Sequence, residues 1–202
     1  MKLKVRIRDY MRNRSPLRIT TDLLFYLLIL SLLLPFSRKY VATGLNKLTM
    51  HRPGIISPSD QVSLTEGDYD WTLMDMGGKS ISFREFRGDF ILLCFWATWC
   101  PPCRAEMPNI QRLYEQYGDR VRFVLASQEP PGTILRFMED HGFNMPVYRL
   151  VQNPPSKLST VTIPTTFLIT PAGNITVRKN GAARWDGAFF TRYLDGMLAR
   201  HP

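Results

Sequence analysis

Residues 90–103 of this 202-residue chain read FILLCFWATWCPPC, an apolar run followed closely by two cysteines that two prolines separate. The run from Phe90 to Trp96 has no charged or strongly polar break, which is typical of a strand covered on both faces of a sheet. Two residues between cysteines allow the sulfurs to meet across the first turn of a helix. The stretch therefore predicts a buried strand that leads into a dithiol/disulfide switch at a helix start.

The two cysteines are expected to have different tasks. A helix N-terminus supplies unpaired N–H groups and a partial positive charge, so we expect Cys100 to be the more acidic thiol and the nucleophile. Cys103, one turn inside the helix, is placed to resolve the mixed disulfide. Pro101 suits the first helical position, where its missing N–H is not needed and its fixed φ is already helical.

Other uses of two closely spaced cysteines make demands that this sequence meets poorly. A structural zinc site needs four ligands, and haem attachment needs a histidine directly after the second cysteine, where Arg104 stands. The further candidates for metal ligands are scattered along the chain: Cys94, His51, His141 and His201. We therefore expect redox chemistry and no metal at Cys100 and Cys103.

The remaining elements follow from hydrophobic periodicity and from the positions of glycine and proline. We expect a β-hairpin (71–74 and 80–83), a strand (90–96), a helix (101–117), a strand (121–126), a helix (133–141), three strands (147–151, 165–170, 175–178) and a closing helix (187–199). Strands separated by helices, followed by a terminal hairpin and helix, predict an α/β fold with a central mixed β-sheet flanked by helices and covered on both faces.

The segment WATWCPPCRAEMP, from Trp96 to Pro108, resembles the thioredoxin-like thiol-disulfide oxidoreductases of the TlpA/ResA type. A second segment, Ile163-Pro164-Thr165-Thr166-Phe167-Leu168-Ile169, resembles the other landmark of that family, and the resemblance extends from about Val62 to Leu198. It implies a thioredoxin-like fold with an N-terminal β-hairpin extension, in an exported and commonly membrane-tethered protein. It also implies that the Ile163–Pro164 peptide bond is cis and faces the cysteines, a form that costs an X–Pro bond only about 0.5–1 kcal/mol.

We expect the substrate to be bound by residues next to the two cysteines: Trp99, Pro101, Pro102, Ile163 and Pro164. A proline at the beginning of a strand can present an unpaired backbone edge to an extended peptide. An ordinary strand-opening proline is the alternative interpretation of Pro164.

Two further residues bear on proton transfer. Glu106 lies three residues beyond Cys103 and shares its side of the helix, so a partly buried carboxylate there is placed to exchange a proton with the thiol. The resemblance implies that this acid tunes the thiols; a solvated helix glutamate is the alternative. Cys94 occupies the strand position at which thioredoxins carry a buried aspartate. We expect it to be a small buried side chain, with a second disulfide partner as the alternative.

The net charge of +9 belongs to the N-terminal part of the chain. Residues 1–52 contain 11 of the 26 Lys and Arg but only 2 of the 17 acids, whereas residues 53–202 contain equal numbers of basic and acidic groups. Because the domain itself is neutral, the charge indicates targeting and not nucleic-acid binding.

Seven basic residues precede an uncharged apolar stretch, Leu23–Ser37, which Arg38 and Lys39 follow. This pattern predicts a basic cytoplasmic segment (1–18), a membrane anchor (19–37), a linker (38–61) and a thioredoxin-like domain (62–202). The excess of positive charge before the stretch places the N-terminus in the cytoplasm and the catalytic domain in the periplasm. A cleaved signal peptide and a soluble periplasmic domain is the alternative, for which Ala42-Thr43-Gly44 offers a cleavage pattern.

These features predict an extracytoplasmic thiol-disulfide oxidoreductase that needs no cofactor beyond the Cys100–Cys103 disulfide. We expect it to reduce disulfides in exported proteins. The resemblance implies two candidate substrates, the cysteines of apocytochrome c and extracytoplasmic proteins with wrong disulfides, and a membrane thiol donor that supplies the electrons. The sequence alone leaves two other functions open: a copper-binding metallochaperone that uses two thiolates, and a thiol peroxidase.

Overall fold

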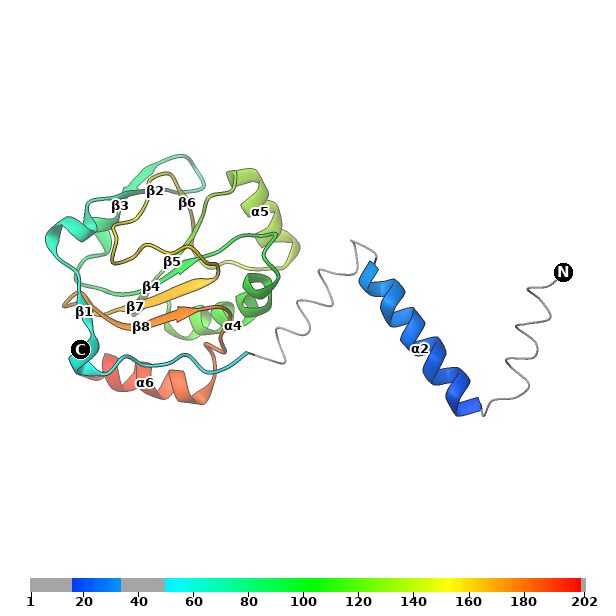
Figure 1. Ribbon diagram of the computed structural model, residues 1–202. Coiled ribbons are helices and arrows are strands. Elements are labelled where there is room, and N and C mark those ends of the chain that lie inside the picture. Colours follow the sequence, from blue (N-terminus) through cyan, green and yellow to red (C-terminus); the bar gives the residue numbers. More distant parts are fainter. Residues whose placement is uncertain (1–15, 34–49, 201–202) are drawn as a thin grey trace. The chain divides into compact units, whose positions relative to one another are not determined.

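The computed structural model describes residues 16–33 and 50–200, which belong to two units (Figure 1). The first unit contains helix α2, Pro16–Leu33, in which the hydroxyls of Thr20 and Thr21 donate to the carbonyl oxygen of Leu17. No helix within the described residues is long and apolar enough to cross a membrane. The anchor predicted for 19–37 is thus not confirmed. Its residues 34–37 lie outside the described ones, as do 1–15 of the basic segment and 38–49 of the linker.

The second unit is a mixed α/β domain. In chain order its elements are the 3-10 helix η1 Pro58–Asp60, β1 Val62–Ser63, the 3-10 helix η2 Glu66–Tyr69, β2 Thr72–Met74, β3 Ser80–Ser82, the 3-10 helix η3 Phe83–Phe86, β4 Phe90–Phe95, α4 Pro101–Tyr117, β5 Val121–Ser127, α5 Pro131–Asp140, β6 Val147–Leu150, β7 Thr165–Ile169, β8 Asn174–Asn180 and α6 Ala188–Leu198. The strands form one sheet in the order β1-β8-β7-β4-β5-β6-β2-β3, and Figure 1 shows β8, β7, β4 and β5 side by side. β5 pairs in parallel with β4 and β6, while the other named pairs are antiparallel. The predicted central mixed sheet is confirmed.

Strand β4 lies inside the sheet because both of its faces are apolar. All six of its residues are buried, and Cys94 stands opposite Leu125 of β5 and Thr166 of β7. Successive side chains of a strand point to opposite faces, so alternate residues of β4 enter two separate hydrophobic clusters. Burial stabilises each Leu or Phe side chain by about 1.5–3 kcal/mol. β4 is therefore a rigid base for the loop that carries Cys100.

The two faces of the sheet are covered by different kinds of structure. One cluster contains buried residues from all three α-helices of the domain, such as Ile110 of α4, Phe137 of α5 and Phe190 of α6. The other cluster is built from the segment 64–86 and Leu158, together with strand residues. Both faces are covered as predicted, but the α-helices contribute to the first cluster only.

The predicted β-hairpin is confirmed as β2 and β3, which pair along their whole lengths. Oδ1 of Asp75 accepts hydrogen bonds from the backbone N–H groups of Gly77 and Lys79, which fixes the turn. Gly78 has a φ of +89°, a conformation that glycine adopts at little cost. Because β2 also pairs with β6, the hairpin extends the central sheet.

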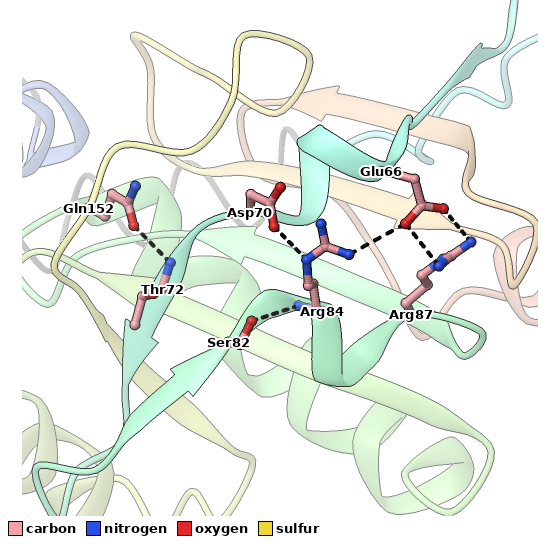
Figure 2. Close-up of polar contacts among 7 residues, drawn as sticks. All are labelled: Glu66, Asp70, Thr72, Ser82, Arg84, Arg87 and Gln152. Carbon is pink, nitrogen blue, oxygen red and sulfur yellow. Dashed lines mark hydrogen bonds and ion pairs between the residues drawn. The ribbon is translucent and has the colours of Figure 1, made fainter.

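Surface ion pairs join the 3-10 helices η2 and η3 beside this hairpin, as Figure 2 shows. Arg84 contacts both Asp70 and Glu66, and Arg87 contacts Glu66. Exposed ion pairs contribute little individually, so this network mainly orients the two helices. The aromatic residues of the same segment, Tyr69, Trp71, Phe83 and Phe86, pack against one another in the second cluster.

Some boundaries differ from the predicted ones. α5 begins at Pro131, two residues before the expected start, because proline fits the first turn of a helix. The strand β1 and the 3-10 helices were not predicted, since β1 has only two residues and a 3-10 helix of three or four residues shows no α-helical period.

The described residues of the predicted linker make backbone contacts with the domain. The carbonyl oxygen of His51 accepts a hydrogen bond from the N–H of Arg184 at 3.2 Å, and the N–H of Ile56 donates to the carbonyl oxygen of Thr176 at 2.8 Å. Residues 50–56 of the predicted linker therefore pack along β8 and the segment that follows β8.

Candidate active site at the start of helix α4

Cys100 and Cys103 form a disulfide at the first turn of α4, and their Cα atoms are 5.3 Å apart. Cys100 is the N-cap residue, and Pro101 and Pro102 occupy the first two helical positions. Neither proline has an N–H, so the first backbone donor of the helix is that of Cys103. This N–H donates to Sγ of Cys100 at 3.3 Å. The sequence CPPC thus directs the first available donor of the helix at one sulfur, where it stabilises negative charge.

Ile163 and Pro164 lie beside this disulfide although they are more than sixty positions away in the sequence. Sγ of Cys100 is 3.8 Å from the carbonyl oxygen of Ile163. The Ile163–Pro164 bond is cis, as the resemblance implied. Pro164 immediately precedes β7, which pairs with β4, and this pairing brings the two segments together.

Glu106 is completely buried, although the sequence suggested only partial burial. Its Oε2 accepts hydrogen bonds from the backbone N–H of Ala183 and from Nε1 of Trp185, both at 3.0 Å. Its Oε1 is 3.7 Å from Sγ of Cys94, whose thiol donates to it. Burial raises the pKa of Glu106 to about 7, and the hydrogen bonds from Trp185, Ala183 and Cys94 partly oppose that rise. The carboxyl group therefore changes charge in the neutral range.

Cys94 is a buried free thiol, so the prediction of a small buried side chain is confirmed. Burial, and secondly the nearby charge of Glu106, raise the pKa of the Cys94 thiol well above its usual value. Cys94 consequently remains a thiol that donates to Glu106. Cys94 thus supplies a neutral hydrogen-bond donor at this strand position.

The loop between β4 and α4 is held from both sides at Thr98. The carboxylate of Glu129 accepts hydrogen bonds from the backbone N–H and the hydroxyl of Thr98, each at 2.6 Å. Nη1 of Arg104 donates to the Thr98 carbonyl oxygen at 3.2 Å. Trp99, the next residue, has 70% of its surface exposed, whereas Trp96 is buried. The structure therefore presents Trp99 to solvent directly before Cys100.

A pocket of about 510 Å³ opens next to this loop. Trp99 and Ile163 line it on the side of the disulfide, and Glu129 and residues 159–161 form other parts of its wall. Of the residues predicted to bind substrate, Trp99 and Ile163 thus share one pocket, while Pro101, Pro102 and Pro164 belong to the adjacent helix start and strand start. Within the residues that the structure describes, no three His, Cys, Asp or Glu side chains group as metal ligands.

Sequence reasoning missed Trp185, Ala183 and Glu129. The first two lie nearly eighty residues after Glu106, beyond any local spacing. Glu129 had a usable signal. It follows the buried strand β5, and the carboxyl ends of the parallel strands β4 and β5 must meet at one edge of the sheet, where Thr98 also lies.

Comparisons with known proteins point in the same direction as this geometry. The model of the AhpC/TSA family matches residues 68–178, which is more than half of the chain and includes both cysteines and the cis proline. The chain belongs to the AhpC/TSA family.

Proteins similar to this chain carry names that describe disulfide chemistry. The thiol-disulfide oxidoreductase ResA of Halalkalibacterium halodurans is 36% identical over 109 residues, which cover 52% of this chain and 62% of that protein. The ResA of Bacillus cereus is 27% identical over 140 residues, covering 67% of this chain and 79% of that protein. Among solved structures, a thiol:disulfide interchange protein of the thioredoxin family from Chlorobium tepidum TLS has 25% identity and a TM-score of 0.51, and the match covers 63% of this chain and 92% of that one.

The predicted thioredoxin-like fold and the predicted resemblance to thiol-disulfide oxidoreductases of the ResA type are thereby confirmed. The fold places the two cysteines at the helix start, as in an enzyme that exchanges disulfides. This AhpC/TSA domain is a thiol-disulfide oxidoreductase.

Proposed function

We propose that the protein reduces disulfides in exported proteins, with Cys100 as the attacking thiol and Cys103 as the resolving thiol. One observation carries this proposal. Sγ of Cys100 receives the N–H of Cys103 on one side and lies 3.8 Å from the carbonyl oxygen of Ile163 on the other. The nucleophile is thus stabilised by the helix and stands beside a backbone edge that suits an extended peptide.

The first step is attack of the Cys100 thiolate on one sulfur of a substrate disulfide. A new S–S bond forms between Cys100 and the substrate, and the second substrate sulfur leaves as a thiolate that takes a proton from water. The N–H of Cys103 favours the charged form of Cys100 before the attack. Pro101 and Pro102 help here by keeping the helix start rigid.

In the second step Cys103 loses its proton and attacks Sγ of Cys100. The substrate sulfur leaves as a thiolate that takes a proton from water, and the protein retains the Cys100–Cys103 disulfide, so two electrons have passed to the substrate. We propose that Glu106 takes up the proton of Cys103. It lies one helical turn away on the same side of α4, and a pKa of about 7 suits a group that exchanges protons near neutral pH.

The cycle needs an external source of two electrons and no cofactor beyond the dithiol. We propose a membrane thiol donor that reduces the Cys100–Cys103 disulfide by the same exchange chemistry run in reverse. We propose the cysteines of apocytochrome c as a candidate substrate. The names of the ResA relatives support the reaction class, thiol–disulfide exchange, and name no substrate.

We also propose that the N-terminal segment tethers the domain to the membrane from the outer side. The support comes from the sequence: seven basic residues precede the apolar stretch and two follow it, a pattern typical of a retained anchor with a cytoplasmic N-terminus. Fractionation of cells that produce the full chain tests this. A tether leaves the intact protein in the membrane fraction after an alkaline wash, whereas the cleaved alternative yields a shortened protein in the soluble fraction.

The direction of electron flow is tested by the midpoint potential of the purified full-length chain. It is equilibrated in a series of thiol–disulfide buffers, with tryptophan fluorescence as the readout, because Trp99 is next to Cys100. A reductase is expected to have a potential at or below about −230 mV, whereas a value near about −120 mV would indicate an oxidant. The Cys100→Ser variant is the control and should show no transition.

A further inference from the structure

The pocket beside the disulfide begins where the cysteine of a substrate must dock. Ile163 lines the pocket, and its carbonyl oxygen is 3.8 Å from Sγ of Cys100. Trp99 and Val161 form an apolar rim, since 70% of Trp99 and all of Val161 are exposed. A side chain that neighbours the reacting cysteine in a substrate is therefore close enough to enter this pocket.

Glu129 is the one charged residue among those that line the pocket. Its carboxylate accepts hydrogen bonds from the N–H and the hydroxyl of Thr98 and from the hydroxyl of Ser127. No ion pair to Glu129 occurs within residues 16–33 and 50–200. The nearby cation, Arg104, donates instead to the Thr98 carbonyl oxygen and contacts His141. Glu129 is thus fixed in position, and no cation of the described residues forms an ion pair with its carboxylate.

The part of the pocket wall at Thr160 is also fixed by hydrogen bonds. The hydroxyl of Thr160 donates to the carbonyl oxygen of Thr162 at 2.9 Å and lies 2.8 Å from the hydroxyl of Thr165. Thr165 is completely buried and also bonds to the side chain of Asn180. A pocket whose walls are already ordered loses little entropy when a side chain enters it.

We propose that this pocket binds a lysine or arginine side chain that neighbours the reacting cysteine of the substrate. The inference rests on the proposed function and names a preferred class of substrate segment. A carboxylate has about four lone-pair sites, so Glu129 can accept a further hydrogen bond from a cationic group. The exposed ring of Trp99 offers a face for a cation–π contact, and Val161 offers apolar surface to the aliphatic stem. An acidic side chain in the same place is repelled.

A set of synthetic peptides tests the proposal through the first step alone. Each peptide carries one cysteine as a mixed disulfide with thionitrobenzoate, and lysine, norleucine or glutamate is placed in turn at the two positions on either side. The Cys103→Ser variant of the full-length chain attacks each peptide, and the released thionitrobenzoate is followed by absorbance. Because that variant cannot resolve the mixed disulfide, the rate constant reports the attack by Cys100.

For at least one of these positions, the peptide with lysine is expected to react about two- to fivefold faster at low salt than the peptide with norleucine. The peptide with glutamate is expected to react more slowly than both. Adding Glu129→Gln should bring the lysine-to-norleucine ratio close to one, and high salt should lower the ratio as well. The ratio within one variant is insensitive to any general change in Cys100 reactivity. Glu139→Gln, at an exposed residue of α5 that does not line the pocket, is the matched control and should keep the preference.

Equal rates for the three peptides at every position, or a lysine preference that survives Glu129→Gln, would overturn this inference while leaving the disulfide chemistry intact. If no peptide released thionitrobenzoate at all, the proposed function itself would fail. The two failures are therefore distinguishable in one experiment.

Discussion

Nε1 of Trp185 donates a hydrogen bond to Oε2 of Glu106 at 3.0 Å and joins residues that are 79 positions apart. This bond connects the segment before α6 to the helix that begins with the dithiol. Together with the N–H of Ala183 and the thiol of Cys94, it gives a completely buried carboxyl group three donors. The donors keep the charged form accessible at a site where burial alone would favour the neutral acid.

The first prediction concerns the pH dependence of stability. The unfolded chain releases the Glu106 proton near its ordinary pKa of 4.5, whereas the folded protein releases it near pH 7. The folded state binds more protons between these values, so stability falls as pH rises through this window. The full difference amounts to about 3 kcal/mol. Glu106→Gln should remove this loss, so the variant should gain stability relative to the parent between pH 5 and pH 8.

Urea unfolding of the oxidised full-length protein at several pH values measures this gain. Glu115→Gln makes the same chemical change at an exposed position of the same helix and serves as the control. Between pH 5 and pH 8, Glu106→Gln should gain more stability relative to the parent than Glu115→Gln does. Parallel pH profiles for the parent and Glu106→Gln would refute the assignment of a neutral-range titration to this carboxyl group.

The second prediction concerns the donor on Trp185. Trp185→Phe removes the indole N–H and leaves an ionised, buried carboxylate with one donor fewer, which costs about 1.5–3 kcal/mol. The cost should be larger at pH 8 than at pH 5, because Glu106 is protonated at the lower value. Trp71→Phe is the matched control: Trp71 is also buried, but its Nε1 has no hydrogen-bond partner in the described structure.

Both tryptophan variants lose the same side-chain volume, so the difference in their response to pH reports the hydrogen bond to Glu106. Urea unfolding at the two pH values gives that difference. If the two variants respond to pH in the same way, then the contact between Trp185 and Glu106 does not set the charge state of the carboxyl group.

The third prediction concerns Cys94. Its thiol is completely buried, and its pKa is raised well above the usual value, first by burial and then by the charge of Glu106. In the oxidised native protein we expect no thiol to react with Ellman's reagent within minutes, and one thiol per chain to react after denaturation. Rapid reaction of the native oxidised protein would show that Cys94 is accessible and is not the fixed donor described above.

The sequence predicted the parts of the site that local pattern determines. The run Phe90–Phe95 had to be a covered strand because all its side chains are apolar, and CPPC had to begin a helix because its prolines suit the first turn. The predictions of a cis bond before Pro164 and of the reaction class depended on the resemblance of two short segments to thiol-disulfide oxidoreductases. Both predictions are confirmed.

Other features depend on contacts between distant segments, which spacing does not reveal. Glu106 is buried because residues 183–185 close over it, and a helix pattern alone gives a glutamate an exposed position. Thr98 and Glu129 meet because β4 and β5 are parallel neighbours, a pairing that becomes definite only with the strand order. The covering of the second sheet face by segment 64–86 escaped prediction for the same reason.

The central claim is that Cys100 attacks and Cys103 resolves. It is tested most directly by trapping, in which the reduced full-length Cys103→Ser and Cys100→Ser variants are each mixed with oxidised protein substrates and analysed by non-reducing mass spectrometry. Cys103→Ser should accumulate a substrate mixed disulfide at Cys100, because nothing remains to release it. Cys100→Ser should form little or none, since Cys103 lies inside α4 and lacks the helix-start N–H that Sγ of Cys100 accepts. Equal trapping by both variants, or trapping at Cys103 alone, would contradict this account.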